Sequence, residues 1–317
     1  MPANVLSEAC AGREPAASGN LQLAFTVAGL RVEMVSVPGG PVLEAYPALD
    51  PFLTKSGPAG MSLSVDWAEE IPTPEGRPVF DSGGVWTLYR RGSDSEFIFR
   101  SPATGDAPYK AAILDDSFRH GRVLLSRHVF GRMPAVYPLE YPLDELLVIH
   151  RLAQGEGVEV HACGVVDERG RGLLFAGHSG AGKSTLARLW QGAGGARILS
   201  DDRVILRRDP EPAGRGRILM HGTPWHGEAR LALPMAAPLC GVYFLEHALR
   251  NEFEALAPGR AAAELLARSF LPYHDAAGLE FALQFFAGVV AETPCSVFRF
   301  VPDATAVRGF GGNERVY

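Results

Sequence analysis

GLLFAGHSGAGKST, residues 172–185, carries the strongest structural signal in this chain. Its first five residues are apolar or small and predict a short buried strand. They lead directly into a glycine-rich loop that ends in Lys-Ser-Thr, which is the GxxxxGK[ST] phosphate-loop pattern. A chance match in a chain of this composition would arise in roughly a few chains per thousand. We therefore expect a phosphate-binding loop between a strand and a helix.

The loop predicts a site for ATP with Mg²⁺. Its glycines let successive backbone N–H groups face a phosphate, Lys183 offers a compact positive charge, and the Ser184 hydroxyl is a magnesium ligand. Apolar residues with helical spacing over 186–190 predict a helix whose N-terminus faces the phosphates, and GAGG at 192–195 ends it. The expected nucleotide-binding residues are Gly177, His178, Ser179, Gly180, Ala181, Gly182, Lys183, Ser184 and Thr185.

An acidic pair, Asp201 and Asp202, separates two apolar runs at 197–200 and 203–206. Carboxylates at the carboxyl end of a strand that neighbours the phosphate-loop strand would lie where α/β folds bind ligands. From there a carboxylate could orient or deprotonate a hydroxyl for attack on a γ-phosphate. The alternative is that the pair caps a turn before Arg203.

His161 lies on an alternating apolar segment before the loop. Strands at 158–166 and 172–176, joined by a turn at about 168–171, would place residue 161 opposite the start of the loop. Its imidazole would then lie near the phosphates. The alternative is a structural histidine, which is the commoner role of a lone His on such a strand.

In order and spacing, VHACGVV at 160–166, the phosphate loop and SDDR at 200–203 resemble the catalytic domain of HPr kinase/phosphorylase, a family related to the phosphoenolpyruvate carboxykinases. The matched motifs span about residues 157–206, with weaker similarity from residue 257 onward. The resemblance implies an α/β P-loop kinase domain of the HPr kinase/PEP carboxykinase type, preceded by a β-rich N-terminal domain. It implies catalytic roles for His161, Lys183 and Asp202, with Asp202 taking the proton from an acceptor serine.

The sequence departs from this family at the metal site. The family places a metal-binding Glu in a strand that aligns with residues 218–222, where this chain has no carboxylate. Either Glu228 replaces it, or magnesium relies on Ser184 and Asp201. The family also follows its loop Ser with Glu, whereas this chain has Thr185.

HGTPWHGE at 221–228 is dense in polar side chains for a loop. His221, His226 and Glu228 either complete the metal site or bind substrate. The alternative is a well-packed turn anchored by Trp225.

The chain divides near residue 150 into two expected domains. Residues 1–20 are rich in Ala, Gly, Ser and Pro and predict a disordered tail. Residues 21–150 predict a β-rich, antiparallel domain, and residues 151–317 predict the phosphate-loop domain. The expected strands of the first domain are 21–37, 61–67, 85–91, 96–100 and 123–129, with a hairpin turn at 92–94. Helices are expected at 143–152, 261–270 and 275–291.

Composition excludes several functional classes. The formal net charge is −6 and no basic stripe occurs, so we expect no nucleic-acid partner. The four cysteines lie far apart, which predicts reduced thiols in a cytoplasmic protein. No segment approaches the ~20 apolar residues of a membrane helix, and the first 20 residues lack a signal-peptide pattern, so we expect no membrane insertion or export.

The expected function is an ATP-dependent phosphotransferase that moves the γ-phosphoryl group to a hydroxyl, with a Ser of a protein or peptide as acceptor. The alternative is a nucleotide-binding sensor or partner-binding protein with little or no kinase activity. The missing metal Glu favours the sensor, whereas Lys183, Ser184 and the acidic pair favour the enzyme. The sequence leaves the acceptor open, and it leaves open whether the chain forms a homo-oligomer.

Overall fold

The computed structural model describes residues 20–209 and 216–310. The expected disordered tail therefore lies, except for Asn20, outside the described residues. The chain splits into two compact units, one formed by the chain up to Thr26 and by Leu30–Asp144, the other by Val27–Gly29 and Glu145–Tyr317. The division falls slightly before the expected boundary near 150, and Glu145, the first residue after it, pairs with Arg203 of the second unit.

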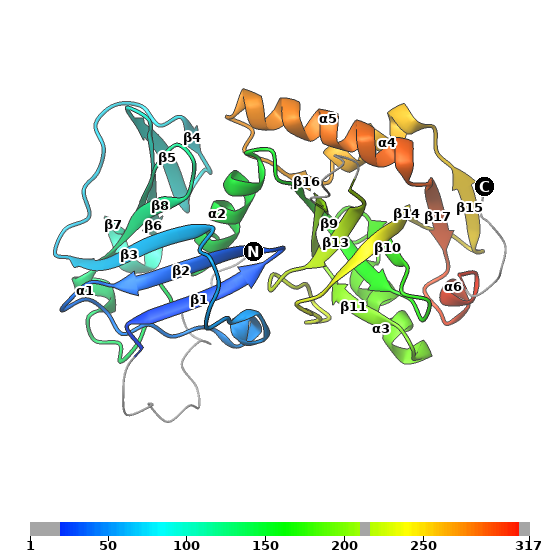
Figure 1. The fold of residues 1–317 in the computed structure, drawn as a ribbon, viewed down its shortest axis with the longest axis horizontal. Helices are drawn as coiled ribbons and strands as arrows, with labels where there is room; N and C mark the ends of the chain where they lie inside the picture. The colour runs from blue at the N-terminus through cyan, green and yellow to red at the C-terminus, as the bar shows by residue number, and fades with distance from the viewer. Residues whose placement is uncertain (1–19, 210–215, 311–317) are drawn as a thin grey trace. The chain divides into compact units, whose positions relative to one another are not determined.

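The first unit contains an eight-stranded sheet with the order β1-β2-β3-β8-β7-β6-β5-β4 (Figure 1). Its strands are β1 Gln22–Val27, β2 Leu30–Ser36, β3 Met61–Ala68, β4 Phe80–Asp81, β5 Trp86–Arg91, β6 Asp94–Ser101, β7 Gly105–Leu114 and β8 His120–Ser126. Its helices are the 3₁₀ turns η1 Pro47–Phe52 and η2 Pro102–Thr104 and the short α1 Arg127–Phe130. The β-rich character of this unit follows from alternating segments with turn residues between them.

Several details of this unit differ from expectation. The expected strand 21–37 is divided into β1 and β2, and the end of the expected strand 123–129 belongs to α1. The β2–β3 and β3–β8 pairs are parallel, so the sheet is mixed and not wholly antiparallel. Strand β7 was not expected, because Gly105 and Pro108 interrupt its apolar pattern. The hairpin turn was predicted correctly: β5 and β6 pair as Arg91↔Asp94, and Gly92 has a φ of 62°.

The second unit contains most of the helices and a nine-stranded sheet. Helix α2 Leu143–Leu152, which has the predicted bounds, leads into it. Its further elements are β9 Val158–Val166, β10 Gly172–Ala176, α3 Lys183–Ala193, β11 Arg197–Ser200, β12 Arg203–Arg208, β13 Ile218–Gly222, β14 Ala236–His247, β15 Glu252–Ala255, α4 Pro258–Leu266, β16 Ser269–Phe270, α5 Ala276–Glu292, β17 Cys295–Phe300 and α6 Thr305–Arg308. The end of the expected helix 261–270 is therefore the short strand β16.

The expected α/β P-loop kinase fold of the HPr kinase/PEP carboxykinase type is wrong. The structure is mostly β, with 39% strand against 23% helix, and contains a five-stranded barrel and a large sheet. Strands β9, β10, β12, β13 and β14 form this ring, which closes because β10 pairs with β14 as well as with β9. The cause is visible in the chain order: β12, β13 and β14 follow one another as antiparallel neighbours, without the crossover helices that a parallel α/β sheet requires.

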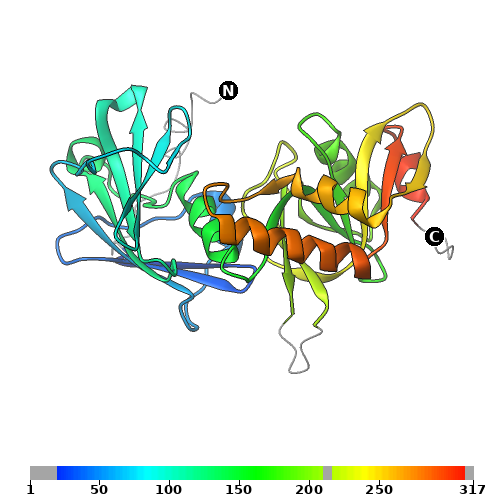
Figure 2. The ribbon, with the colours of Figure 1, turned by 90° about the horizontal axis from the view of Figure 1, so that it is seen from above.

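Strand β10 divides its side chains between two hydrophobic clusters, as period-two alternation requires. Leu174 and Ala176 belong to the cluster that includes residues of α4 and α5, whereas Leu173 and Phe175 belong to the cluster that includes residues of α3 and α6. Figure 1 shows α4 and α5 on one side of these strands and α3 on the other, and Figure 2 shows α5 running lengthwise over the unit. The loop after β10 therefore follows a strand whose two faces are both packed against other side chains.

Within the part of the chain that the structure describes, no helix is long and apolar enough to cross a membrane.

Candidate active site

The β9–β10 hairpin carries His161 to the start of the phosphate loop. The two strands pair antiparallel with Ala176 opposite Ala162. The next backbone N–H, of Gly177, donates to the carbonyl of His161 at 3.4 Å. The predicted register of this hairpin is therefore confirmed.

The phosphate loop connects β10 to α3 through two glycines in the left-handed region. Gly180 has a φ of 82°, and Gly182, which precedes the first residue of α3, has a φ of 92°. A side chain at Gly182 would also collide with Phe300, since its Cβ would lie 2.7 Å from the ring. These positions need glycine for conformation and, at Gly182, for space. Helix α3 ends at Ala193 before Gly194, as the sequence predicts.

Lys183 is folded back onto its own loop. Its ammonium donates to the carbonyl oxygens of Gly177 at 3.0 Å and His178 at 3.1 Å, and the side chain is buried. Burial lowers the pKa of Lys183 from its ordinary value, and the negative charge of Asp202 opposes this shift without cancelling it. Since both partners are neutral carbonyls, a phosphate oxygen would be a stronger partner for this ammonium.

Asp201 connects the loop to a second segment of the chain. Its side chain is fully buried, and its Oδ2 accepts from the Ser184 hydroxyl at 2.8 Å. The same carboxylate accepts backbone N–H groups of Gly227 at 2.9 Å, Ala229 at 2.9 Å and Leu231 at 3.3 Å. Four donors fill the acceptor positions of the carboxylate. The hydroxyl of Ser184 donates its proton inward, so its lone pairs remain for a ligand.

Asp202 lies between a histidine and an arginine. His161 donates from Nε2 to Oδ1 of Asp202 at 2.9 Å, and Arg203 pairs with Oδ2. Arg203 also pairs with Glu145 of α2. Burial alone would raise the pKa of the Asp202 carboxyl, but the hydrogen bond from His161 and the charge of Arg203 outweigh it and lower that pKa. Asp202 is therefore ionised at neutral pH.

The acidic pair does not cap the turn in which it lies. The hydroxyl of Ser200 accepts the backbone N–H groups of Asp202 at 3.2 Å and Arg203 at 3.1 Å, so Ser200 supplies the cap. Both carboxylates are left for other contacts.

The strand before the acidic pair is not the direct neighbour of β10. Strand β11 pairs with β9, which lies between them, and both β10 and β11 run antiparallel to β9. They are consequently parallel to each other and end at the same edge. This brings Asp201 to Ser184 despite the intervening strand.

The segment after β13 crosses directly over the acidic pair. A Cβ on Gly227 would lie 2.7 Å from Oδ2 of Asp201 and 3.2 Å from Oγ of Ser184, so a side chain there would displace the Asp201 carboxylate from its present contacts. Arg188 of α3 donates to the carbonyl of Glu228 at 3.0 Å, while the Glu228 side chain is exposed. Gly227 was missed by sequence reasoning, because nothing in HGTPWHGE distinguishes it from a turn glycine.

The histidines of this segment have different surroundings. His221 lies on β13 opposite Ile205, and burial lowers its pKa to about 4. Nδ1 of His226 lies within hydrogen-bonding distance, 3.1 Å, of the carbonyl oxygen of Gly227. Trp225 is buried, as the packed-turn alternative expects.

No group of three or more His, Cys, Asp or Glu side chains that could hold a metal ion occurs among the described residues. His178, Ser179 and Gly180 are exposed, and Thr185 is half-buried at the start of α3.

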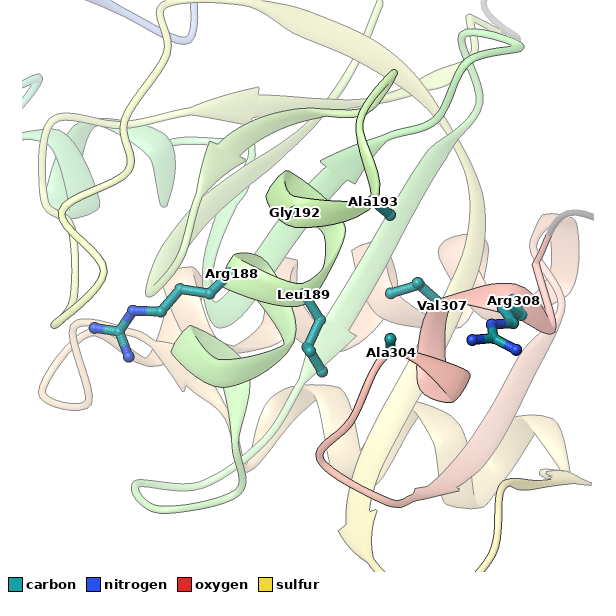
Figure 3. Close-up of a pocket in the computed structure, with 7 residues that line it drawn as sticks. All are labelled: Arg188, Leu189, Gly192, Ala193, Ala304, Val307 and Arg308. Carbon is teal, nitrogen blue, oxygen red and sulfur yellow. The ribbon is translucent and has the colours of Figure 1, made fainter.

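A separate pocket of about 420 Å³ lies between the C-terminal half of α3 and α6. It is lined by Arg188, Leu189, Gly192, Ala193, Ala304, Val307 and Arg308. Figure 3 shows Leu189 and Val307 extending into the space between the two helices, whereas Arg188 extends away from α6. None of the expected nucleotide or catalytic residues lines this pocket.

Comparison of the chain with protein-family models finds no match, and comparison with proteins of curated function finds none either. The resemblance to HPr kinase/phosphorylase therefore gains no support from these comparisons.

Proposed function

We propose that this protein binds ATP with Mg²⁺ at the phosphate loop and transfers the γ-phosphoryl group to a hydroxyl. One observation carries the proposal: the loop and the acidic pair meet, with Ser184 Oγ 2.8 Å from Asp201 and Asp202 held by His161 at 2.9 Å. An ammonium, a hydroxyl and an ionised carboxylate then converge on one strand edge. This is the set of groups that phosphoryl transfer uses.

The chain's own groups fit the phosphates and the metal. The loop amides and the N-terminus of α3 supply donors and a favourable dipole. Lys183 would exchange its loop carbonyls for phosphate oxygens, and Ser184 presents lone pairs because its proton is directed to Asp201. Magnesium, when bound, neutralises charge on the phosphates. Since the acceptor positions of Asp201 are filled, we assign to it the orientation of Ser184 and no direct metal contact.

Asp202 is the proposed base. The acceptor oxygen forms a bond to the γ-phosphorus, the bond from that phosphorus to the bridging oxygen breaks, and ADP leaves. The hydroxyl proton passes to Asp202. Oδ2 is the oxygen that can be released for it, because its partner Arg203 keeps a second carboxylate, Glu145. His161 would hold Oδ1 throughout and keep the carboxylate in place.

A serine of a protein or peptide is the proposed acceptor, and the cytoplasm, where ATP is present, is the proposed location. The free thiols Cys163, Cys240 and Cys295 agree with a reducing compartment.

A second candidate function is a nucleotide-responsive sensor. The contacts of Asp202 favour it, because both of its oxygens are paired within the protein, with His161 and Arg203. In that case the pair would link the phosphate loop to β12 and act only as structure.

The test is phosphoryl transfer from labelled ATP to proteins of a lysate from the source organism, with Asp202→Asn as the variant. We expect this variant to bind ATP with Mg²⁺ within about threefold of the wild-type affinity and to transfer phosphate about 10²–10⁴-fold more slowly. Asp81→Asn, which changes an exposed carboxylate in the first unit, is the matched control and should bind ATP and transfer phosphate as the wild type does.

Transfer by Asp202→Asn at the wild-type rate would remove Asp202 as base. Nucleotide binding by the wild type without transfer to any acceptor would favour the sensor.

A further inference from the structure

His247 lies beside the tip of the phosphate loop because of the strand register. Strands β14 and β10 run parallel, with Ala176 opposite Phe244. His247, the last residue of β14, is thus level with the loop that follows Ala176. Its Nε2 lies 3.1 Å from the carbonyl oxygen of Gly180. Because a carbonyl can only accept, Nε2 carries the hydrogen.

We propose that His247 is a positioning residue that holds the Gly180–Ala181 peptide and so maintains the loop conformation to which nucleotide phosphates bind. The inference rests on the proposed nucleotide site and adds to it a residue that no loop motif contains.

The imidazole of His247 is itself held by the sheet. His247 is opposite Phe300 in the β14–β17 pair, and their ring centroids lie 5.3 Å apart at 31°. On the loop side, a Cβ on Gly182 would lie 3.1 Å from Cε1 of His247. The ring of His247 is exposed, but it contacts both Phe300 and the glycine before α3. These two contacts and the bond to Gly180 favour one orientation of the imidazole.

The anchored peptide belongs to a tight turn. The N–H of Ala181 donates to the carbonyl of His178 at 3.1 Å, with Gly180 in the left-handed region at a φ of 82°. In a trans peptide the carbonyl and the following N–H point in opposite directions. Holding the Gly180 oxygen therefore also sets the direction of the Ala181 N–H. Rotation of this peptide would break both hydrogen bonds, so the bond from His247 adds to the one that the turn already makes.

His247 complements Lys183 in holding the loop. Lys183 also binds the loop carbonyl of His178, at 3.1 Å, but this contact is lost when the ammonium turns to a phosphate. The bond from His247 to Gly180 does not compete with the ligand. We infer that His247 keeps the loop in shape at the moment when Lys183 leaves it.

Two substitutions of His247 test its hydrogen-bond donor separately from its aromatic ring. In His247→Gln the amide nitrogen can reach the position of Nε2, whereas in His247→Asn it ends near the position of Nδ1 and cannot reach Gly180. Calorimetry with ADP and Mg²⁺ should show about 3–10-fold weaker binding for His247→Asn, the loss of one hydrogen bond, and about wild-type binding for His247→Gln. Equal affinity in wild type and His247→Asn, or equal weakening in both variants, would overturn the proposal.

Hydrogen exchange without nucleotide makes the test independent of the proposed function. The amides of residues 178–182 should exchange faster in His247→Asn than in the wild type, and His247→Gln should restore the wild-type rate. If the wild type binds no nucleotide but the variants show this exchange pattern, the anchoring role of His247 is supported and the proposed nucleotide site is rejected. An unchanged exchange rate in His247→Asn rejects the anchor itself.

Discussion

Lys110 in the first unit and Lys183 in the second are both buried, and burial is the main cause that lowers the pKa of each. Their partners differ. Lys110 reaches the carbonyl of Glu140 at 3.2 Å and its carboxylate at 3.5 Å, and it lies over the Phe99 ring at 4.7 Å from the centroid. Lys183 has the carbonyls of its own loop.

The partners of a buried lysine indicate whether its charge is available to bind a ligand. The contacts of Lys110 include a carboxylate and an aromatic face, which compensate its charge within the fold. The carbonyl partners of Lys183 leave its charge without a hydrogen-bonded anion, so an incoming phosphate offers more than it displaces. Burial and a lowered pKa alone would not distinguish the two side chains.

The largest expected effect is on the stability of the first unit. Lys110→Ala removes the methylene chain beside Phe99 and the partner of Glu140, and should lower the free energy of unfolding by about 3 kcal/mol. Lys110→Met keeps the volume without the charge and should stay within about 1 kcal/mol of the wild type. Urea unfolding measures both. A Lys110→Ala variant as stable as the wild type would contradict the structural role.

Lys183→Ala should show the opposite pattern. The loss of a charge-assisted contact to phosphate should weaken ATP binding about 10–100-fold, because such contacts contribute about 1.5–3 kcal/mol. Its free energy of unfolding should change by less than that of Lys110→Ala, since only two neutral carbonyl contacts are lost. Calorimetry and urea unfolding on the same sample test the comparison, and equal destabilisation by both alanine variants would break it.

The smallest expected effect is the pH dependence that His221 adds to the free energy of unfolding of the second unit. Burial lowers the pKa of His221 from 6.5 to about 4, so the unfolded chain binds a proton in this interval that the folded chain does not. Stability should therefore fall as pH decreases from 6.5 to about 4, by about 1.4 kcal/mol at pH 5.5. His221→Gln should lose this part of the dependence. Urea unfolding of both proteins at pH 7.5 and 5.5 measures it, and equal pH dependence would reject the assignment.

The sequence predicts those parts of the molecule that depend on local pattern. Helix α2, the β9–β10 hairpin and the glycine-rich turn before α3 follow from periodicity and from glycines at fixed spacing. Lys183 and Ser184 could be identified as candidates for the same reason, because their chemistry requires particular side chains at particular places in the motif.

The fold class could not be predicted in this way. Residues 172–176 pair with a segment that lies far along the chain, beginning at Leu239. Alternation shows that a strand exists but does not give its partner, so a barrel and an open sheet produce the same pattern. The resemblance supplied a fold that the pairing of β10 with β14 contradicts.

The candidate site shows a similar limit. Asp201 is predicted to hold magnesium together with Ser184, and the structure adds contacts that the sequence does not indicate: its carboxylate accepts the backbone N–H groups of Gly227, Ala229 and Leu231. Every residue except proline carries a backbone N–H, so the sequence does not indicate which of these groups will bind a carboxylate. His247 was missed because only the parallel register of β14 brings it to the loop.

Closure of the five-stranded ring pairs β10 on both of its sides. With β9 on one side and β14 on the other, β10 offers no open edge to another chain and cannot separate from the sheet without breaking two ladders. The segments at its rim, 177–182 and 223–231, are held by contacts of their own rather than by strand pairing. The exposed residues of these segments, His178, Ser179 and Glu228, can therefore be exchanged to alter ligand preference, whereas Gly182 and Gly227 must be kept.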